Sequence, residues 1–267
     1  MTAGTIVQRI GFVVVIVAAA SRVLAQPAET PPAAAANVLR NDSDPTRPVF
    51  FSLRPEIYSP NRDITQTAVI FRYDRAQLAK RRWLPGKRGV ILRFEMPLTT
   101  TAVSGATTQA GLGDAYGQLL VSPYFSRTFA FVVGSGLRIP TATDPLLGAG
   151  KWVAAPAAAP VWFFPKHIFF VKAQNFSSFA GDAARPDINF FLVTPTFIHT
   201  LTPSWWYLVD GETKTDWTRN NKTSVRGGLQ VGHAFNSRFS FWVKPEGIWN
   251  DDQDNQWNLK FGLVWYR

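Results

Sequence analysis

The stretch Trp257-Asn258-Leu259-Lys260-Phe261-Gly262-Leu263-Val264-Trp265-Tyr266 alternates large apolar residues with polar or small ones over most of its length. Side chains on a β-strand point alternately to opposite faces, so this stretch predicts a strand with one apolar face and one face that carries Asn258 and Lys260. Residues 88–98, 222–233 and 238–248 show the same alternation. The chain is therefore expected to build a sheet whose two faces differ in polarity.

Two features of these strands favour a membrane barrel over a soluble sandwich. Charges such as Arg93 and Glu95 stand in mid-strand, where a dry core between two sheets would not tolerate them but a wet barrel lumen would. The apolar face ends in Trp249, Trp257 and Trp265, as expected for aromatic residues at a membrane interface. We therefore expect the apolar face to contact outer-membrane lipid.

The spacing of the strands predicts their number and order. Twelve segments rich in β-branched and aromatic residues are predicted as strands, and the links between them alternate between very short and long. Outer-membrane barrels show this asymmetry, with short periplasmic turns and longer outer loops. The prediction is an all-β, closed, antiparallel up-and-down transmembrane β-barrel of about twelve strands over residues 49–267. The predicted strands are 50–58, 65–74, 88–98, 113–124, 128–139, 152–164, 167–178, 187–199, 204–211, 222–233, 237–248 and 257–266.

The predicted links also contain one exception. Short links are expected at 126–127, 165–166, 202–203 and 236–237, and long ones around 99–112, 140–151, 179–186, 212–221 and 249–256. The link 75–87 is long where the alternation requires a short one. Its basic residues Lys80, Arg81, Arg82, Lys87 and Arg88 suit either a solvated turn or contact with anionic head groups.

The N-terminal residues predict export. Arg9, the apolar run 10–20 and Val23-Leu24-Ala25 match the parts of a secretory signal peptide over 1–25. The apolar run is shorter than the roughly 20 residues of a membrane-spanning helix. Residues 26–48 begin with a Pro- and Ala-rich run and are expected to form a flexible arm or a partial plug of the lumen. The predicted location is the outer membrane.

Prolines within the strands need an accommodation. A proline lacks the backbone N–H that a ladder requires, so bulges or strand ends are expected where prolines fall. These positions are Pro55, Pro97, Pro123, Pro195 and Pro245.

Composition excludes several classes of function. The chain has no Cys and only three His, which show no ligand spacing, so neither a metal site nor a cofactor is expected. The net charge of +10 arises from scattered basic residues and not from a nucleic-acid-binding module. None of the three His is followed two residues later by Ser, which would align a base and a nucleophile on one strand. We expect neither nucleic-acid binding nor enzyme activity.

The polar faces of the strands predict the residues of the lumen. Three strands repeat a basic-x-acidic pattern, and residues at i and i+2 share a face. This face suits either a charged constriction that selects permeants or an ion-pair network that neutralises itself in a closed lumen. The candidate lumen and permeation residues are Arg54, Glu56, Arg72, Arg93, Glu95, Arg138, Lys172, Arg226, Lys244, Glu246 and Lys260, and Asp74 shares their face.

Two motifs suggest a family. Gly111-Leu112-Gly113-Asp114 opens a predicted strand, and the segment from Pro140 to Trp152 contains Pro-Thr-Ala-Thr and Leu-Gly-Ala-Gly-Lys-Trp. Together they resemble the "MetA-pathway of phenol degradation" family of transporters, over about residue 50 to the end. The resemblance implies an outer-membrane barrel that passes small, often aromatic or hydrophobic, molecules. It implies no catalytic residues.

The leading interpretation is a channel or transporter for small molecules. The alternatives are a structural or interaction barrel with a salt-bridged, closed lumen and, third, an outer-membrane lipid-modifying enzyme. The final strand ends in Val264-Trp265-Tyr266-Arg267, which is similar to the C-terminal signal read by the outer-membrane assembly machinery, although a terminal Arg follows the aromatic residues.

Overall fold

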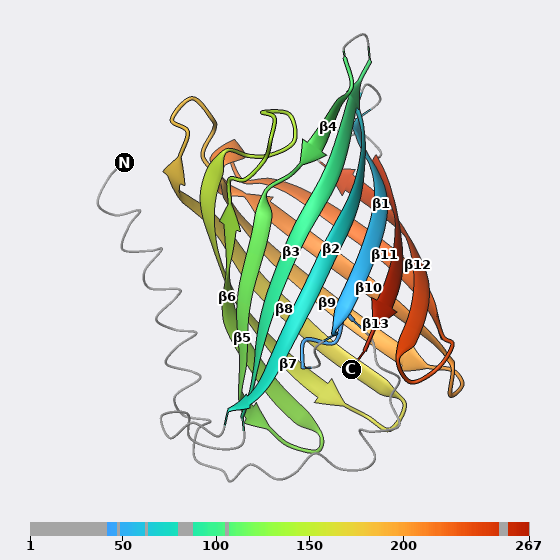
Figure 1. Ribbon diagram of the computed structural model, residues 1–267. Coiled ribbons are helices and arrows are strands. Elements are labelled where there is room, and N and C mark those ends of the chain that lie inside the picture. Colours follow the sequence, from blue (N-terminus) through green and yellow to red (C-terminus); the bar gives the residue numbers. More distant parts are fainter. Residues whose placement is uncertain are drawn as a thin grey trace.

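The chain folds into one closed, antiparallel β-barrel with tilted strands (Figure 1). The structure is a computed structural model that describes residues 42–46, 49–61, 64–79, 88–104, 107–250 and 256–266. The predicted signal peptide 1–25 and most of the arm 26–48 lie outside the described residues. No helix in the described part is both long and apolar enough to span a membrane. The strands are β1 (Phe51–Asn61), β2 (Ile64–Ala79), β3 (Arg88–Val103), β4 (Gln109–Leu112), β5 (Ala115–Phe125), β6 (Phe129–Ile139), β7 (Lys151–Phe163), β8 (His167–Gly181), β9 (Asn189–Thr200), β10 (Trp205–Asp216), β11 (Lys222–Ala234), β12 (Phe239–Asn250) and β13 (Gln256–Trp265), with a short 3-10 helix, η1 (Trp217–Arg219), between β10 and β11.

The barrel has twelve strand positions, as predicted. β4 and β5 together fill one strand position, because both pair with β3 and only Gly113 and Asp114 separate them. The strand at each position pairs with its neighbours in sequence, and β1 pairs with β13 to close the barrel. Closure leaves no unpaired edge, which a barrel in lipid requires.

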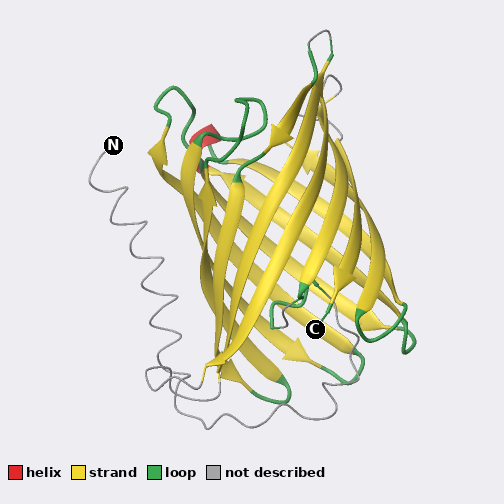
Figure 2. Cartoon of the chain, viewed as in Figure 1, coloured by secondary structure: helices red, strands yellow, loops and turns green. Residues whose placement is uncertain are grey.

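From β3 to β13 the connections alternate between short turns and longer loops as predicted, although the longer loops are shorter than expected. The connection between β1 and β2 comprises only residues 62 and 63, although it lies on the side of the longer loops. Strands such as β2, β3, β8 and β10 extend beyond their predicted ends. The exceptional link 75–87 is shorter than predicted, because β2 continues to Ala79 and β3 begins at Arg88. Residues 80–87, which include four of the five basic residues of the predicted patch, lie outside the described residues. The short turns and the C-terminal end of β13 lie at one end of the barrel, which we call the periplasmic end (Figure 2).

The two faces of each strand divide as the alternation predicted. On β13, Asn258, Gly262 and Val264 are buried inside, whereas Trp257 on the opposite face is 48% exposed. Apolar side chains exposed on the outside include Leu92, Phe94, Leu119, Val209, Val225 and Leu229. Such a surface suits lipid, because soluble proteins rarely expose apolar patches of this extent.

Aromatic rings follow the outer surface near the periplasmic end. Trp265 contacts Phe51 and Phe239, and Trp162 contacts Phe129 and Phe169, with centroid distances between 5.1 and 5.7 Å. Aromatic side chains favour the membrane–water boundary. Trp249 lies near the end of β12 and Trp257 near the start of β13, so both lie at the other end of the barrel.

The prolines are accommodated by gaps in pairing on one side of their strands. A register shift brackets Pro123 between Val121 and Tyr124. Pro195 pairs with β8 but is skipped in the ladder with β10, and Pro245 pairs with β13 but is skipped in the ladder with β11. Pro55 is paired with β2 but skipped by β13, and Pro97 lies where β3 changes partner from β5 to β4. A proline can therefore sit in a closed barrel if only one ladder lapses.

Candidate functional site

The charged residues assigned to the lumen from sequence lie inside the barrel. Ten of the eleven line its cavities, and Glu246 lies behind them at 4% exposure and contacts three of them. The ten are Arg54, Glu56, Arg72, Arg93, Glu95, Arg138, Lys172, Arg226, Lys244 and Lys260.

A first ion-pair cluster surrounds the buried carboxylate of Asp74 on β2. Both terminal oxygens of Asp74 accept hydrogen bonds from Arg72, at 3.0 and 2.6 Å, and Nε of Arg93 lies 3.1 Å away. The backbone N–H of Val49 donates to Asp74, and Arg72 donates to the carbonyl of Asp42 at 3.0 Å. This cluster therefore holds residues 42–46 and 49–50, which we call the inner strap, against the barrel wall.

A second cluster converges on Glu246 of β12. Its carboxylate lies 2.8 Å from Lys244, 2.9 Å from Lys260 and 3.5 Å from Arg226. These cations extend the network, because Lys260 also contacts Glu56, Lys244 contacts Asp210 and Arg226 contacts Glu212. Charges removed from water are tolerated only when they are paired in this way.

One of the three basic-x-acidic motifs forms an ion pair within itself. Only Lys244 and Glu246 pair with each other, whereas Arg54 pairs with Glu95 at 3.2 Å and Arg93 pairs with Asp74. Side chains two residues apart on one strand are separated by about 6.6 Å of backbone, which exceeds the roughly 5 Å between directly opposed residues of adjacent strands. Partners across strands are therefore easier to reach.

Two acidic residues of the network were missed from sequence. Asp210 and Glu212 lie on β10, which was expected to end at residue 211 and in fact continues to Asp216. Trp206 and Leu208 lie on the same inward face. Continuing that alternation by two steps would have placed both carboxylates in the lumen.

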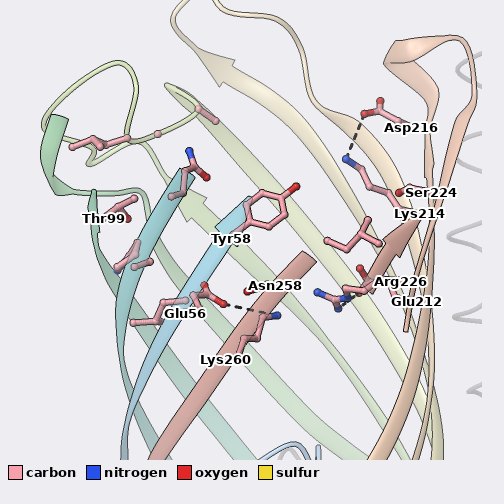
Figure 3. Close-up of a pocket in the computed structure, with 18 of the residues that line it drawn as sticks. Glu56, Tyr58, Thr99, Glu212, Lys214, Asp216, Ser224, Arg226, Asn258 and Lys260 are labelled. Carbon is pink, nitrogen blue, oxygen red and sulfur yellow. Dashed lines mark hydrogen bonds and ion pairs between the residues drawn. The ribbon is translucent and has the colours of Figure 1, made fainter. Parts of the chain in front are cut away.

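The lumen contains two adjoining chambers. The outer chamber, toward the long loops, has a volume of about 980 Å³, and the inner chamber has a volume of about 630 Å³. Figure 3 shows the ion pairs Glu56–Lys260 and Glu212–Arg226 at the outer chamber. These four residues line both chambers, and so does the segment 147–149. They frame the passage from one chamber to the other.

The loop 140–150 reaches this passage because Asp114 holds it. The carboxylate of Asp114 accepts hydrogen bonds from the backbone N–H groups of Ala142, at 3.3 Å, and Ala149, at 2.7 Å. The hydroxyl of Thr141 donates to the carbonyl of Gly113, and the hydroxyl of Thr101 donates to Leu146 at 3.4 Å. The two sequence motifs that suggested a family therefore meet in space as one fixed loop.

The periplasmic half of the lumen is packed with apolar side chains. Val132, Val161, Ile168 and Trp206 are at most 2% exposed, and they belong to one cluster of buried residues. The inner strap contributes Val49, at 1% exposure, to the same cluster. Leu120, Phe170, Leu208 and Trp242 form the upper edge of this layer and the floor of the inner chamber.

Glycines make room for the indole rings of this layer. Trp206 on β10 lies against Gly232 on β11, and Trp242 on β12 lies against Gly262 on β13. A Cβ atom at either glycine would overlap the ring. The missing side chains let the two rings lie flat inside the barrel.

Two of the predicted cations stand apart from both clusters. Within the described residues, no carboxylate oxygen lies within 4.0 Å of the Lys172 ammonium or the Arg138 guanidinium. Arg138 instead lies over the ring of Phe176, 5.7 Å from its centroid. Both cations line the inner chamber.

The three histidines lie on the outside of the barrel, away from the lumen. His167 and His199 oppose each other on β8 and β9, with their Nδ1 atoms 2.6 Å apart, and His233 contacts the exposed Trp205. The described residues contain no group of three or more His, Cys, Asp or Glu placed to hold a metal ion.

Solved structures with the same architecture are outer-membrane proteins. The COG4313 outer membrane channel from Pseudomonas putida F1 superposes with a TM-score of 0.67 at 12% identity, over 85% of this chain and 99% of that one. The chain has the fold of an outer-membrane channel. The NanC porin gives a TM-score of 0.54 at 7% identity, over 81% of this chain and 100% of its own. The KdgM porin gives 0.51 at 10% identity, over 81% and 99%.

These likenesses establish the fold but not a family. No family model matches the sequence, and a search of curated proteins finds no match. The predicted membership of the "MetA-pathway of phenol degradation" family therefore stays a prediction.

Proposed function

We propose that this barrel is a channel of the outer membrane that passes small molecules. The observation that carries the proposal is the pair of adjoining chambers, which extend from the outer loops to mid-lumen between polar walls. A barrel that served only as a scaffold would have no need of such a lined cavity. The signal peptide over 1–25 would direct export, and the final strand would be read by the assembly machinery.

The proposed channel is closed at its periplasmic end in this structure. The apolar layer and the inner strap lie between the inner chamber and the periplasm. Passage requires this layer to part, which gives the strap the role of a gate. This role develops the expectation that part of the arm 26–48 plugs the lumen.

We propose permeants that are small and partly hydrophobic or aromatic. The apolar floor of the inner chamber supports this, since Phe170 and Trp242 offer ring faces to a solute. The resemblance to the "MetA-pathway of phenol degradation" family implies permeants of the same class.

The test combines planar bilayers with liposomes. The folded protein, verified by its heat-dependent mobility on a detergent gel, should give single-channel openings and should accelerate the entry of small aromatic solutes into liposomes. A folded protein that gives neither conductance nor solute flux would refute the proposal.

A structural barrel with a salt-bridged, closed lumen is the second candidate. The apolar layer and the ion-pair clusters around Asp74 and Glu246 favour it, because together they fill the inner half of the barrel. This candidate predicts no flux under any condition, so the same experiment separates the two.

A further inference from the structure

Some charged side chains of the inner chamber form ion pairs within it, and others do not. Its carboxylates at Glu56, Glu95 and Asp210 each pair with a cation, namely Lys260, Arg54 and Lys244. Lys172 and Arg138 line the same chamber, and no described carboxylate lies within 4.0 Å of either. The chamber therefore presents two cations whose charge no ion pair neutralises.

The carboxylates that attract these two cations already accept hydrogen bonds from other groups. Glu212, which attracts Lys172, accepts hydrogen bonds from Arg226 at 3.0 Å and from the hydroxyl of Thr194 at 3.2 Å. Asp114, which attracts Arg138, holds the loop amides of Ala142 and Ala149. The hydrogen bonds of Asp114 occupy both of its carboxylate oxygens, and those of Glu212 converge on one oxygen, Oε2. Glu95, which also attracts Lys172, pairs with Arg54.

Apolar side chains lie directly below Lys172. Phe170 is two residues nearer the periplasmic end of the same strand and shares its inward face. Leu120, Val132 and Trp242 line the same floor. A solute whose charged end meets Lys172 would thus place its body against an apolar surface.

We propose that the inner chamber binds a small organic anion, a carboxylate on an apolar or aromatic body, with the carboxylate on Lys172 and the body on the floor around Phe170. The proposal rests on the channel function and specifies its substrate class. A bound carboxylate would give Lys172 a counter-charge at ion-pair distance, and a charge-assisted hydrogen bond is about twice as strong as a neutral one.

Arg138 provides a first binding position for the same anion, before it reaches Lys172. It contacts Phe176, four residues beyond Lys172 on β8, which corresponds to about 13 Å along a strand. Because the two cations lie at different depths along the lumen, they would bind the anion in succession. Arg138 lies toward the outer chamber, and Lys172 lies deeper.

The test measures binding to the folded protein in detergent, which requires no conduction. Calorimetric titrations use benzoate, benzyl alcohol and benzylamine, which share a ring but differ in charge. The variants are Lys172→Met and Lys172→Gln, with Lys214→Met as the matched control. Lys214 also carries a positive charge in the lumen, but it lies in the outer chamber, paired with Asp216 at 3.6 Å.

Benzoate should bind more tightly than either analogue, and both Lys172 variants should weaken it by roughly 10- to 100-fold. Lys214→Met should change it little. Equal binding of benzoate and benzyl alcohol, or equal losses in the Lys172 variants and Lys214→Met, would overturn the proposal. Benzoate binding without any flux would refute the proposed channel function but not the proposed anion-binding site. Flux without a benzoate preference would refute the site alone.

Discussion

Three cations depend on one carboxylate at Glu246. Replacing it in Glu246→Gln keeps the shape but leaves Arg226, Lys244 and Lys260 crowded together with less compensation. Breaking a buried ion pair costs about 3–5 kcal/mol, so the variant should unfold at lower urea concentration or lower temperature. Asp187→Asn is the control, because the side chain of Asp187 is 68% exposed and its pair with Lys151 is worth less than about 1 kcal/mol. Equal stability of the two variants would show that the cluster is not held by Glu246.

Gly232 and Gly117 offer a matched pair of glycines in the barrel wall. A methyl group at Gly232 would meet the indole of Trp206, whereas a methyl group at Gly117 would meet nothing within 4 Å. Gly232→Ala should therefore lower the free energy of unfolding by roughly 1–3 kcal/mol through overpacking, and Gly117→Ala should not. Urea titration followed by gel mobility measures both. Equal tolerance at the two positions would argue against the ring lying on Gly232.

At this scale the sequence predicted which residues face the lumen but not their partners. Period-2 alternation placed all eleven candidates inside, because it needs only the local strand. Pairing such as Arg54 with Glu95 depends on strand register and tilt, which no local pattern encodes. Glu212 was missed because β10 was predicted to end at residue 211, whereas Asp210 lay within the predicted strand but was not assigned to the lumen.

The loop 140–150 is the element that narrows the lumen, and Asp114 fixes it. Asp114→Ala removes the acceptor for two loop amides, so the loop should loosen, and single-channel conductance should rise or become noisier. Asn236→Ala is the control, because Asn236 also accepts hydrogen bonds from two backbone amides, those of Arg238 and Phe239, but in a turn at the periplasmic end. Unchanged conductance in Asp114→Ala would show that the loop does not limit the passage.

Strand positions and turn asymmetry followed from the sequence, but strand lengths did not. Charged residues such as Glu212 and Lys214 suggest a loop when a segment is read alone, yet a lumen accommodates them within a strand. The inward fold of the loop 140–150 was also beyond prediction. Its motifs were visible, but the contact between them joins residues about 30 positions apart in the sequence.

For the molecule as a whole, the apolar layer is the barrier that a permeant of the proposed channel would have to pass. Trp206 is fully buried there, and Trp206→Ala would leave a cavity that costs about 3–5 kcal/mol and removes part of the barrier. Conductance in planar bilayers should rise several-fold over the unsubstituted protein. Trp249→Ala, which truncates an exposed ring on the outer surface, should leave conductance unchanged. A Trp206→Ala protein that is folded but no more conductive would place the barrier elsewhere.

The ion pairs between the first and last strands also determine how the barrel can assemble. Glu56 of β1 meets Lys260 of β13 only when the two ends of the sheet come together, and Lys260 also serves Glu246. Until then these charges would face lipid or an incomplete lumen, where an unpaired charge is costly. Contacts between residues so distant in sequence form slowly because the loop entropy must be lost first. Insertion of this chain should therefore be a single late event in which the seam closes and the charges are neutralised together.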